Sequence, residues 1–441
     1  MDKIKYFFTL VFVASVFLLL FAAVPSDVVF ADGRKDFFAV EPTKKTDGAG
    51  SVVKPWDVTV TLKYTDKEFE YRLSDNIADF TPEQIESRHI FRSPAVKGKW
   101  VADMADKGID AEQSICFILP RFKDFIENVC SSLDYEPIDA TIIFKPNAKE
   151  KFIYTKDKEG RRVNDKQLYE AVLKGLKDGE TCLVNDLPVE KISPDLPLSA
   201  ALNATKKRGE FTTDCSNSTK GRKHNIALAL SFFNGKIIKD GERVSFNETV
   251  GARTRDRGFD VAKVLLKGKY VDGVGGGVCQ ASTTLYNALL LGGVTVKGVC
   301  QHSLQSSYVL PSFDAMVSDA GADLVFLNDT GSDLYIAAKM TNGVARVEIY
   351  GLKKEYEIVR RSEIVGTIPF ETKKVVDDGS YSHLVTFTDQ TVTVSEGKDG
   401  IKSQGWLDYY KDGKKVNSRL IRVNTYGPTD RLLVTGSKER E

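Results

Sequence analysis

The chain has 441 residues, of which 42% are hydrophobic and 28% are charged, and its formal net charge is +1. This length exceeds what one ordinary hydrophobic core accommodates, so the sequence predicts several domains. The near-neutral charge excludes a general electrostatic attraction to nucleic acid, and we predict no nucleic-acid partner.

The first 31 residues have the pattern of a secretory signal peptide. Two lysines precede an apolar run over residues 6–24, and a Val-Phe-Ala sequence ends at Ala31. Small residues at these positions are typical of a cleavage site. The apolar run is also nearly long enough to cross a bilayer, so a retained signal anchor is the alternative. We therefore expect an exported protein at the extracellular face of the membrane or in the cell wall, with membrane contact only through this segment.

Residues 32–55 are polar and rich in Lys, Thr and Gly, which predicts a flexible spacer. An α+β domain is expected over residues 56–190. Its predicted elements are a β-hairpin over residues 58–73, a helical stretch over 115–133 interrupted at Pro120, a strand pair at 142–144 and 152–154, and a helix that begins after Asn164. Residues 191–213 are expected to be a linker.

The central region, residues 214–352, is predicted to be β-rich with two helices. The first helix covers residues 222–233. The second follows a glycine-rich loop and ends at Gly292-Gly293. Short strands are predicted at residues 244–247, 262–266, 294–300, 308–310, 315–317, 323–326, 334–339 and 344–350.

The glycine-rich loop carries the strongest chemical signal. Gly275, Gly276 and Gly277 lie just before Cys279, and glycines allow positive φ and a close approach of a ligand to the backbone. The apolar run over residues 281–291 predicts that Cys279 lies at the start of a helix. Free N–H groups and the helix dipole stabilise a thiolate there, so Cys279 is a candidate nucleophile.

Three other roles for Cys279 compete: half of a disulfide, a metal ligand, or an inert buried thiol. The chain has five further cysteines, and Cys215 and Cys300 are the specific disulfide partners to consider. Neither a CxxC pair nor an HxxxH spacing is present in the sequence. We therefore predict no metal site and no cofactor.

Residues from about 214 to 351 resemble the VanW family of bacterial proteins. The resemblance is carried by Arg222 with Asn225, Asn234-Gly235, the GERVSFN segment at 241–247, Val250-Gly251, Gly258-Phe259 with Ala262, the GGGVCQASTTLYNA run at 275–288, Gln301-His302-Ser303, and Phe313-Asp314-Ala315. Some members of this family are associated with L,D-transpeptidation of peptidoglycan through the cysteine of this motif. The preceding domain is similar to the peptidoglycan-binding domain that commonly accompanies VanW domains, and a spacer without a ligand is the alternative.

The C-terminal region, residues 363–441, is predicted to be a small all-β domain. The segments at 368–372, 396–400 and 433–436 resemble the G-five domain, a family linked to polymers that contain N-acetylglucosamine. The fold class expected for the whole chain is therefore α+β multidomain: an N-terminal α+β domain, a β-rich centre with a helix after the glycine loop, and an all-β C-terminal domain.

A thiol nucleophile needs a base, and His302 is the candidate because imidazole titrates near neutrality. Asp314 is a candidate for orienting the imidazole, and its alternative role is a turn acceptor. The backbone N–H groups of Cys279 and Gln280, with the Gln280 amide, are candidates for stabilising an oxyanion; Gln280 is equally well explained as a helix-terminal residue.

Substrate-binding candidates are the loop glycines and the arginines Arg222, Arg253 and Arg255, whose guanidinium groups can pair with a carboxylate. The arginines are equally well explained as surface charges. The expected partner is peptidoglycan, through its peptide stems and its glycan. The expected reaction is cysteine-dependent acyl transfer on the stems, by a transpeptidase or a carboxypeptidase. The alternative is a protein that binds the cell wall without catalysis.

Overall fold

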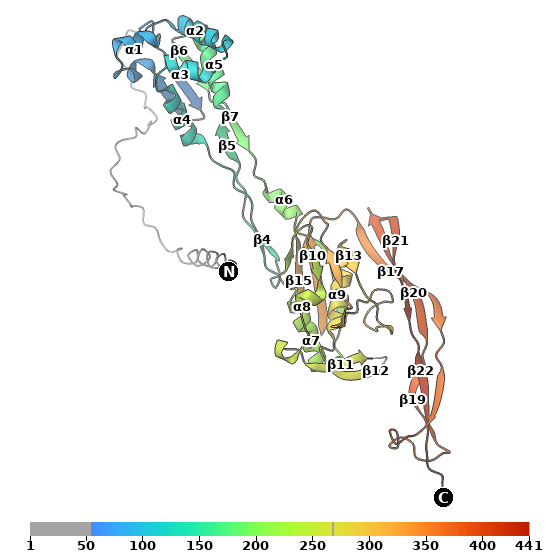
Figure 1. Ribbon diagram of the computed structural model, residues 1–441. Coiled ribbons are helices and arrows are strands. Elements are labelled where there is room, and N and C mark those ends of the chain that lie inside the picture. The colour runs from blue at the N-terminus through green and yellow to red at the C-terminus, as the bar shows by residue number, and fades with distance from the viewer. Residues whose placement is uncertain (1–53, 267–268, 441) are drawn as a thin grey trace, which may run out of the picture. The chain divides into compact units, whose positions relative to one another are not determined.

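The computed structural model describes residues 54–266 and 269–440, and the chain forms two compact units (Figure 1). The predicted signal peptide and nearly all of the predicted spacer lie outside these residues. Within them, no helix is both long enough and apolar enough to cross a membrane. The first unit contains the described part of residues 1–132 together with residues 164–188, and the second contains residues 133–163 and 189–441.

The first unit is a small α+β domain. Strand β1 pairs antiparallel with β2, as the predicted hairpin requires, and parallel with β6. Pro120 separates α3 from α4, and the Asn164 side chain accepts a hydrogen bond from the N–H of Gln167 at 3.0 Å at the start of α5. The elements are β1 (Thr59–Tyr64), β2 (Lys67–Arg72), α1 (Pro82–Ser87), α2 (Pro94–Asp106), α3 (Ala111–Ile118), α4 (Phe122–Leu133), α5 (Asp165–Lys177) and β6 (Cys182–Asp186).

The second unit begins with two antiparallel strand pairs. Strand β3 (Ile142–Phe144) pairs with β4 (Phe152–Tyr154), and β5 (Gly160–Val163) pairs with β7 (Val189–Ile192). The ring of Phe152 packs edge-on against Tyr335 and Tyr350 of the central sheet. The β3–β4 hairpin is therefore anchored by aromatic packing to the body that follows it.

The body of the second unit is a four-stranded antiparallel sheet covered by two helices. The strand order is β8-β16-β15-β9, with α9 packed against β8 and β16 and α7 packed against α9 and β15. A second sheet has the order β10-β14-β13, and β11 pairs with β12. The elements are α6 (Leu198–Asn203), β8 (Lys206–Asp214), α7 (Lys220–Ser231), β9 (Ile237–Ile238), β10 (Arg243–Ser245), α8 (Phe246–Val250), β11 (Val261–Leu266), β12 (Lys269–Val274), α9 (Val278–Leu291), β13 (Thr295–Gly298), β14 (Val325–Leu327), β15 (Leu334–Thr341) and β16 (Val344–Gly351).

Three local predictions differ from this body. Residues 191–213, expected to be a linker, contain α6 and most of β8, whose partner β16 is far away in the sequence. The predicted strand at 244–247 ends at Ser245, because the Ser245 hydroxyl accepts from the N–H of Glu248 at 3.0 Å and starts α8. Residues 308–310 and 315–317 form no strand; Ala315 instead exchanges hydrogen bonds with side chains of α9.

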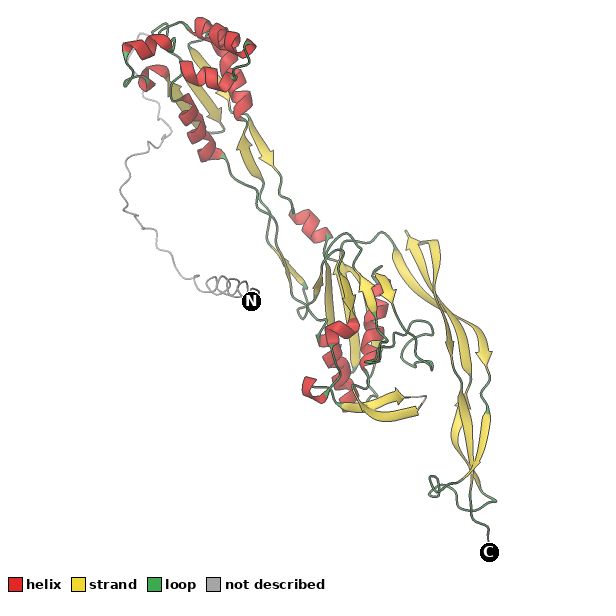
Figure 2. Cartoon of the chain, in the orientation of Figure 1, coloured by secondary structure: helices red, strands yellow, loops and turns green. Residues whose placement is uncertain are grey.

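The C-terminal part of the second unit is all β among its described residues, as predicted, and consists of two three-stranded sheets with long strands (Figure 2). The strand orders are β17-β20-β21 and β18-β22-β19. Ile358 of β17 and Leu407 of β20 are buried in the same hydrophobic core as α7 and α9. The strands are β17 (Glu357–Ile368), β18 (Thr372–Val376), β19 (Thr391–Lys398), β20 (Gly400–Lys411), β21 (Lys414–Tyr426) and β22 (Thr429–Thr435).

These observations confirm the predicted fold class: a mixed α+β chain with an N-terminal α/β region, central sheets, and C-terminal all-β sheets. The shared core also shows that the first C-terminal sheet is packed into the central body through its own apolar side chains.

Candidate active site

The glycine loop ends at the helix that carries Cys279. Gly277 is the N-cap of α9 and has φ 110°, a conformation that strongly favours glycine. A Cβ atom on Gly277 would lie 2.9 Å from Cγ of Arg222, and one on Gly276 would lie 2.7 Å from the backbone oxygen of Lys263. The space left by the missing side chains is therefore filled by the protein itself. A ligand was expected to approach the backbone there, but no space is left for it on this side of the loop.

Asn225 of α7 holds the glycine loop in place through hydrogen bonds. Its side-chain amide donates to the backbone oxygen of Gly276 at 3.0 Å and to that of Asp260 at 2.9 Å, and its oxygen accepts from the N–H of Asp260 at 2.7 Å. Asn225 is completely buried. Since each of these bonds satisfies a buried polar group, the helix and the loop are held as one rigid element.

Cys279 is the second residue of α9 and is a partly exposed, free thiol. Its Sγ lies 3.3 Å from the backbone oxygen of Val317. Neither Cys215 nor Cys300 is bonded to Cys279, so the structure contains neither of the disulfides considered for it. Within the described residues, the backbone N–H of Cys279 has no hydrogen-bond acceptor, whereas the N–H of Gln280 donates to the oxygen of Gly277 at 2.8 Å. The first of these donors is therefore free to bind an anion at the helix start.

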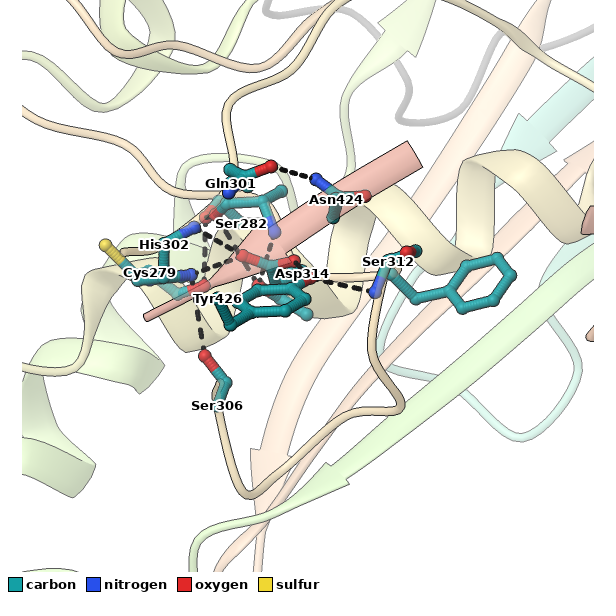
Figure 3. Close-up of polar contacts among 12 residues, drawn as sticks. Cys279, Ser282, Gln301, His302, Ser306, Ser312, Asp314, Asn424 and Tyr426 are labelled. Atoms are coloured by element: carbon teal, nitrogen blue, oxygen red, sulfur yellow. Dashed lines mark hydrogen bonds and ion pairs between the residues drawn. The ribbon is translucent and has the colours of Figure 1, made fainter. Parts of the chain in front are cut away.

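His302 and Asp314 form the pair that the sequence predicted (Figure 3). Nδ1 of the His302 ring lies 2.7 Å from Oδ2 of Asp314, and the backbone N–H of His302 donates to the same oxygen at 2.6 Å. With Nδ1 directed at the carboxylate, Nε2 is left as the nitrogen that can exchange a proton with a neighbour. The structure thus brings Cys279, His302 and Asp314 together.

Charge interactions favour an ionised cysteine beside a protonated histidine. Burial by itself raises the pKa of the Cys279 thiol, but the adjacent His302 and, more weakly, the positive charge of Arg253 bring it below its ordinary value. Burial alone would lower the pKa of His302, but Asp314 and the Cys279 thiolate raise it to about 9. Burial raises the pKa of Asp314, and its hydrogen bonds to His302 and Tyr426 outweigh that effect and lower it.

Helix α9 carries polar residues that hold the Asp314 segment. Ala315 donates its N–H to the Thr283 hydroxyl at 3.0 Å and accepts from Ser282 at 2.6 Å, and Asn287 donates to the oxygen of Phe313 at 2.8 Å. These three helix residues are fully buried. The sequence predicted an apolar helix here, and no role was predicted for these polar side chains. The signal was present, because polar side chains within a buried helix require partners.

The Gln280 side chain is used for structure. It is 2% exposed; its amide donates to the backbone oxygen of Asp214 at 2.9 Å and to the Thr213 hydroxyl at 3.2 Å, and its oxygen accepts from Arg222 at 3.1 Å. Since its amide and its backbone N–H are both engaged, Gln280 is not available to an oxyanion in this arrangement. Arg222 is in turn bound to α9 through the side chain of Gln280.

Arg253 lies close enough to influence Cys279, but its own charge is paired. Its guanidinium donates to Asp319 at 2.5 Å and to the side-chain oxygen of Asn247. Only 8% of the Arg253 side chain is exposed, whereas Asp319 is 63% exposed. Arg255 lines an open surface pocket of 410 Å³ whose walls contain neither Cys279 nor His302. Among the described residues, no cluster of His, Cys, Asp and Glu side chains is arranged to hold a metal ion.

The central body matches a known family. Residues 221–350 match the family described as "VanW like protein". These residues form a VanW domain. The domain includes the glycine loop, Cys279, His302 and Asp314, and the sequence motifs predicted it.

Two relatives are similar to between a quarter and a third of this chain. The YoaR protein of Bacillus subtilis (strain 168) is 36% identical over 147 residues, which is 33% of this chain and 48% of that protein. The vancomycin B-type resistance protein VanW of Enterococcus faecalis (strain V583) is 30% identical over 135 residues, which is 27% of this chain and 49% of that protein. The chain therefore spans about half the length of the curated relatives that it matches.

Among solved structures, the crystal structure of HP0197-G5 is similar to 19% of this chain over its whole length, with 22% sequence identity and a TM-score of 0.12. A TM-score this low supports no inference about the C-terminal sheets.

Proposed function

We propose that this protein acts on peptidoglycan in the cell envelope by cysteine-dependent acyl transfer of the L,D-transpeptidase type. The observation that carries the proposal is the set of three side chains near the start of α9: Asp314 lies 2.7 Å from Nδ1 of His302, and His302 is close enough to Cys279 to lower the pKa of its thiol. A nucleophile, a base and a group that orients the base are the parts that acyl transfer requires.

In the first step, the Cys279 sulfur attacks the carbonyl carbon of the amide that precedes the terminal D-residue of a tetrapeptide stem. A carbon–sulfur bond forms, the carbon–nitrogen bond breaks, and the proton held by His302 passes to the departing amine. The free N–H of Cys279 is the donor proposed for the oxyanion of the tetrahedral intermediate.

In the second step, an amine of another stem attacks the thioester. A new amide bond forms, the carbon–sulfur bond breaks, and His302 receives the proton of the amine. Water in place of the amine would give a carboxypeptidase. Both outcomes share the acyl-enzyme and differ only in the group that reaches it.

A setting in the cell envelope is supported by the name of the Enterococcus relative, which connects that protein with vancomycin resistance. The signal-peptide pattern of residues 1–31 and the resemblance of the C-terminal region to a G-five domain support the same setting. Peptide stems are the proposed substrate, and glycan that contains N-acetylglucosamine is the proposed ligand of the C-terminal region.

The test incubates the protein and its Cys279→Ala variant with tetrapeptide muropeptides and separates the products by liquid chromatography and mass spectrometry. We expect cross-linked dimers and free D-amino acid from the wild type and neither from the variant. Tripeptide without dimer would assign a carboxypeptidase. Equal dimer from both proteins, or no product from either, would remove the enzymatic proposal and favour a protein that binds the cell wall without catalysis.

A further inference from the structure

A tyrosine of the C-terminal sheet contacts the candidate active site directly. Tyr426, the last residue of β21, donates its hydroxyl to Oδ1 of Asp314 at 2.6 Å and accepts from the backbone N–H of Ser312 at 2.8 Å (Figure 3). This places it on the carboxylate oxygen that His302 does not use. Tyr426 and Asp314 are each 1% exposed.

Other contacts fasten the same strand to the segment that carries His302. Arg422 donates to the backbone oxygen of Asp314, and the Asn424 amide donates to the side-chain oxygen of Gln301. Gln301 returns a hydrogen bond to the backbone oxygen of Thr425 at 2.7 Å, and the N–H of Gly427 donates to the oxygen of Ser303 at 2.8 Å. Both residues that flank His302 are thus bonded to the C-terminal region.

The hydrogen bond from Tyr426 matters because the Asp314 carboxylate that accepts it is buried. A buried carboxylate is stable only when both of its oxygens have donors. Oδ2 of Asp314 accepts from His302, and Tyr426 is the side-chain donor on Oδ1. Removal of that hydroxyl would leave one carboxylate oxygen unsatisfied. The carboxylate would then turn or take up a proton, and the imidazole would lose its fixed partner.

We propose that Tyr426 is a positioning residue of the active site, and that the C-terminal β-sheet is thereby a working part of the site rather than an appended binding module. Tyr426 acts through Asp314 on His302 and touches neither the thiol nor the substrate. The inference rests on the proposed function, since it concerns how the same cysteine is activated.

The experiment measures the reactivity of the Cys279 thiol directly and needs no substrate. Wild-type protein, Tyr426→Phe and Tyr410→Phe are alkylated with iodoacetamide from pH 5 to pH 10, and labelling of the peptide that contains Cys279 is followed by mass spectrometry. Tyr410 is on the paired strand β20, and its hydroxyl makes no hydrogen bond among the described residues, so it is the matched control.

We expect the wild type and Tyr410→Phe to show an inflection below the ordinary thiol pKa. For Tyr426→Phe we expect the inflection to move to higher pH and the labelling rate at pH 7 to fall several-fold. A profile that is unchanged, or that moves to lower pH, would overturn the proposal. A merely structural tyrosine would lower the melting temperature without moving the inflection.

If Tyr426→Phe fails to fold, Asn424→Ala takes its place. This change removes the contact with Gln301 beside His302 but retains the Tyr426 hydroxyl, so a smaller shift in the same direction is expected, and no shift would overturn the coupling. The two proposals fail in different ways. A wild-type Cys279 with an ordinary inflection would sink the proposed function, whereas a low wild-type inflection that both variants retain would sink only the role of the C-terminal sheet.

Discussion

Oδ2 of Asp314 accepts two hydrogen bonds from His302, one from the backbone N–H at 2.6 Å and one from ring Nδ1 at 2.7 Å. A single carboxylate oxygen therefore fixes both the main chain and the ring of the same residue. These two hydrogen bonds determine which ring nitrogen faces the thiol. The electrostatics of the site therefore depend on Asp314, which does not contact the thiol.

The first prediction concerns Asp314→Asn. The amide keeps the size of the side chain but removes the charge that stabilises the imidazolium, so the His302 pKa should fall from about 9. We expect kcat/KM for muropeptide cross-linking to fall by roughly 10²–10⁴-fold and the alkaline limb of its pH profile to move to lower pH. Asp329→Asn, at an exposed site, is the control. An unshifted alkaline limb would contradict the assigned role.

The second prediction concerns stability and pH. The pKa of His302 is raised in the folded protein, to about 9 from an unfolded value of 6.5. Its stabilising contribution is therefore complete below pH 6.5 and is lost as the pH rises through about 9. The difference in melting temperature between the wild type and His302→Gln should shrink from pH 6 to pH 9.5. Asp314→Asn should lose the same dependence. A difference that stays constant over this range would refute it.

The third prediction concerns Gly277→Ala. The new Cβ meets the Arg222 side chain at 2.9 Å and the Arg222 backbone oxygen at 3.0 Å, and φ is 110°. We expect a loss of roughly 2–4 kcal/mol in the free energy of unfolding, from backbone strain together with the clash. Gly241→Ala is the matched control, because φ is 78° there but no atom lies within 4 Å of the added Cβ. It should cost about 1 kcal/mol, as measured by urea denaturation. Equal losses in the two variants would show that the contact with Arg222 is unimportant.

The fourth prediction concerns Gln280→Met. The change removes a buried amide that joins Thr213, Asp214 and Arg222, so we expect a loss of about 1–3 kcal/mol of stability. The rate of Cys279 alkylation at pH 7 should stay within a few-fold of the wild type, since no hydrogen bond of this side chain reaches the thiol. Gln113→Met, at an exposed position of α3, controls for the substitution itself. If Gln280→Met kept full stability but lost Cys279 labelling, Gln280 would instead have a role in the reactivity of the thiol.

Local patterns in the sequence were sufficient for several elements. Alternation along the first hairpin, the Asn164 cap and the glycines before Cys279 each act on neighbouring residues, so the sequence predicted β1, β2, α5 and the start of α9. The motif around residues 301–315 also indicated His302 and Asp314 as partners, and both lie together in the fold.

Tertiary structure decided what depends on distant contacts. Strand β8 looked like linker because its partner β16 begins 130 residues after it ends. The polar residues of α9 acquire their role only from the backbone of residues 313–315.

By itself, the sequence of this protein determined the candidate nucleophile Cys279, its candidate base His302 and the helix that carries the cysteine, because these depend on residue type and short-range geometry. Only the tertiary structure decided that Gln280 is structural and that Tyr426, 112 positions from Asp314, completes the carboxylate. Hydrogen bonds between buried groups are set by where the folded chain brings them together, and spacing along the sequence carries no record of that.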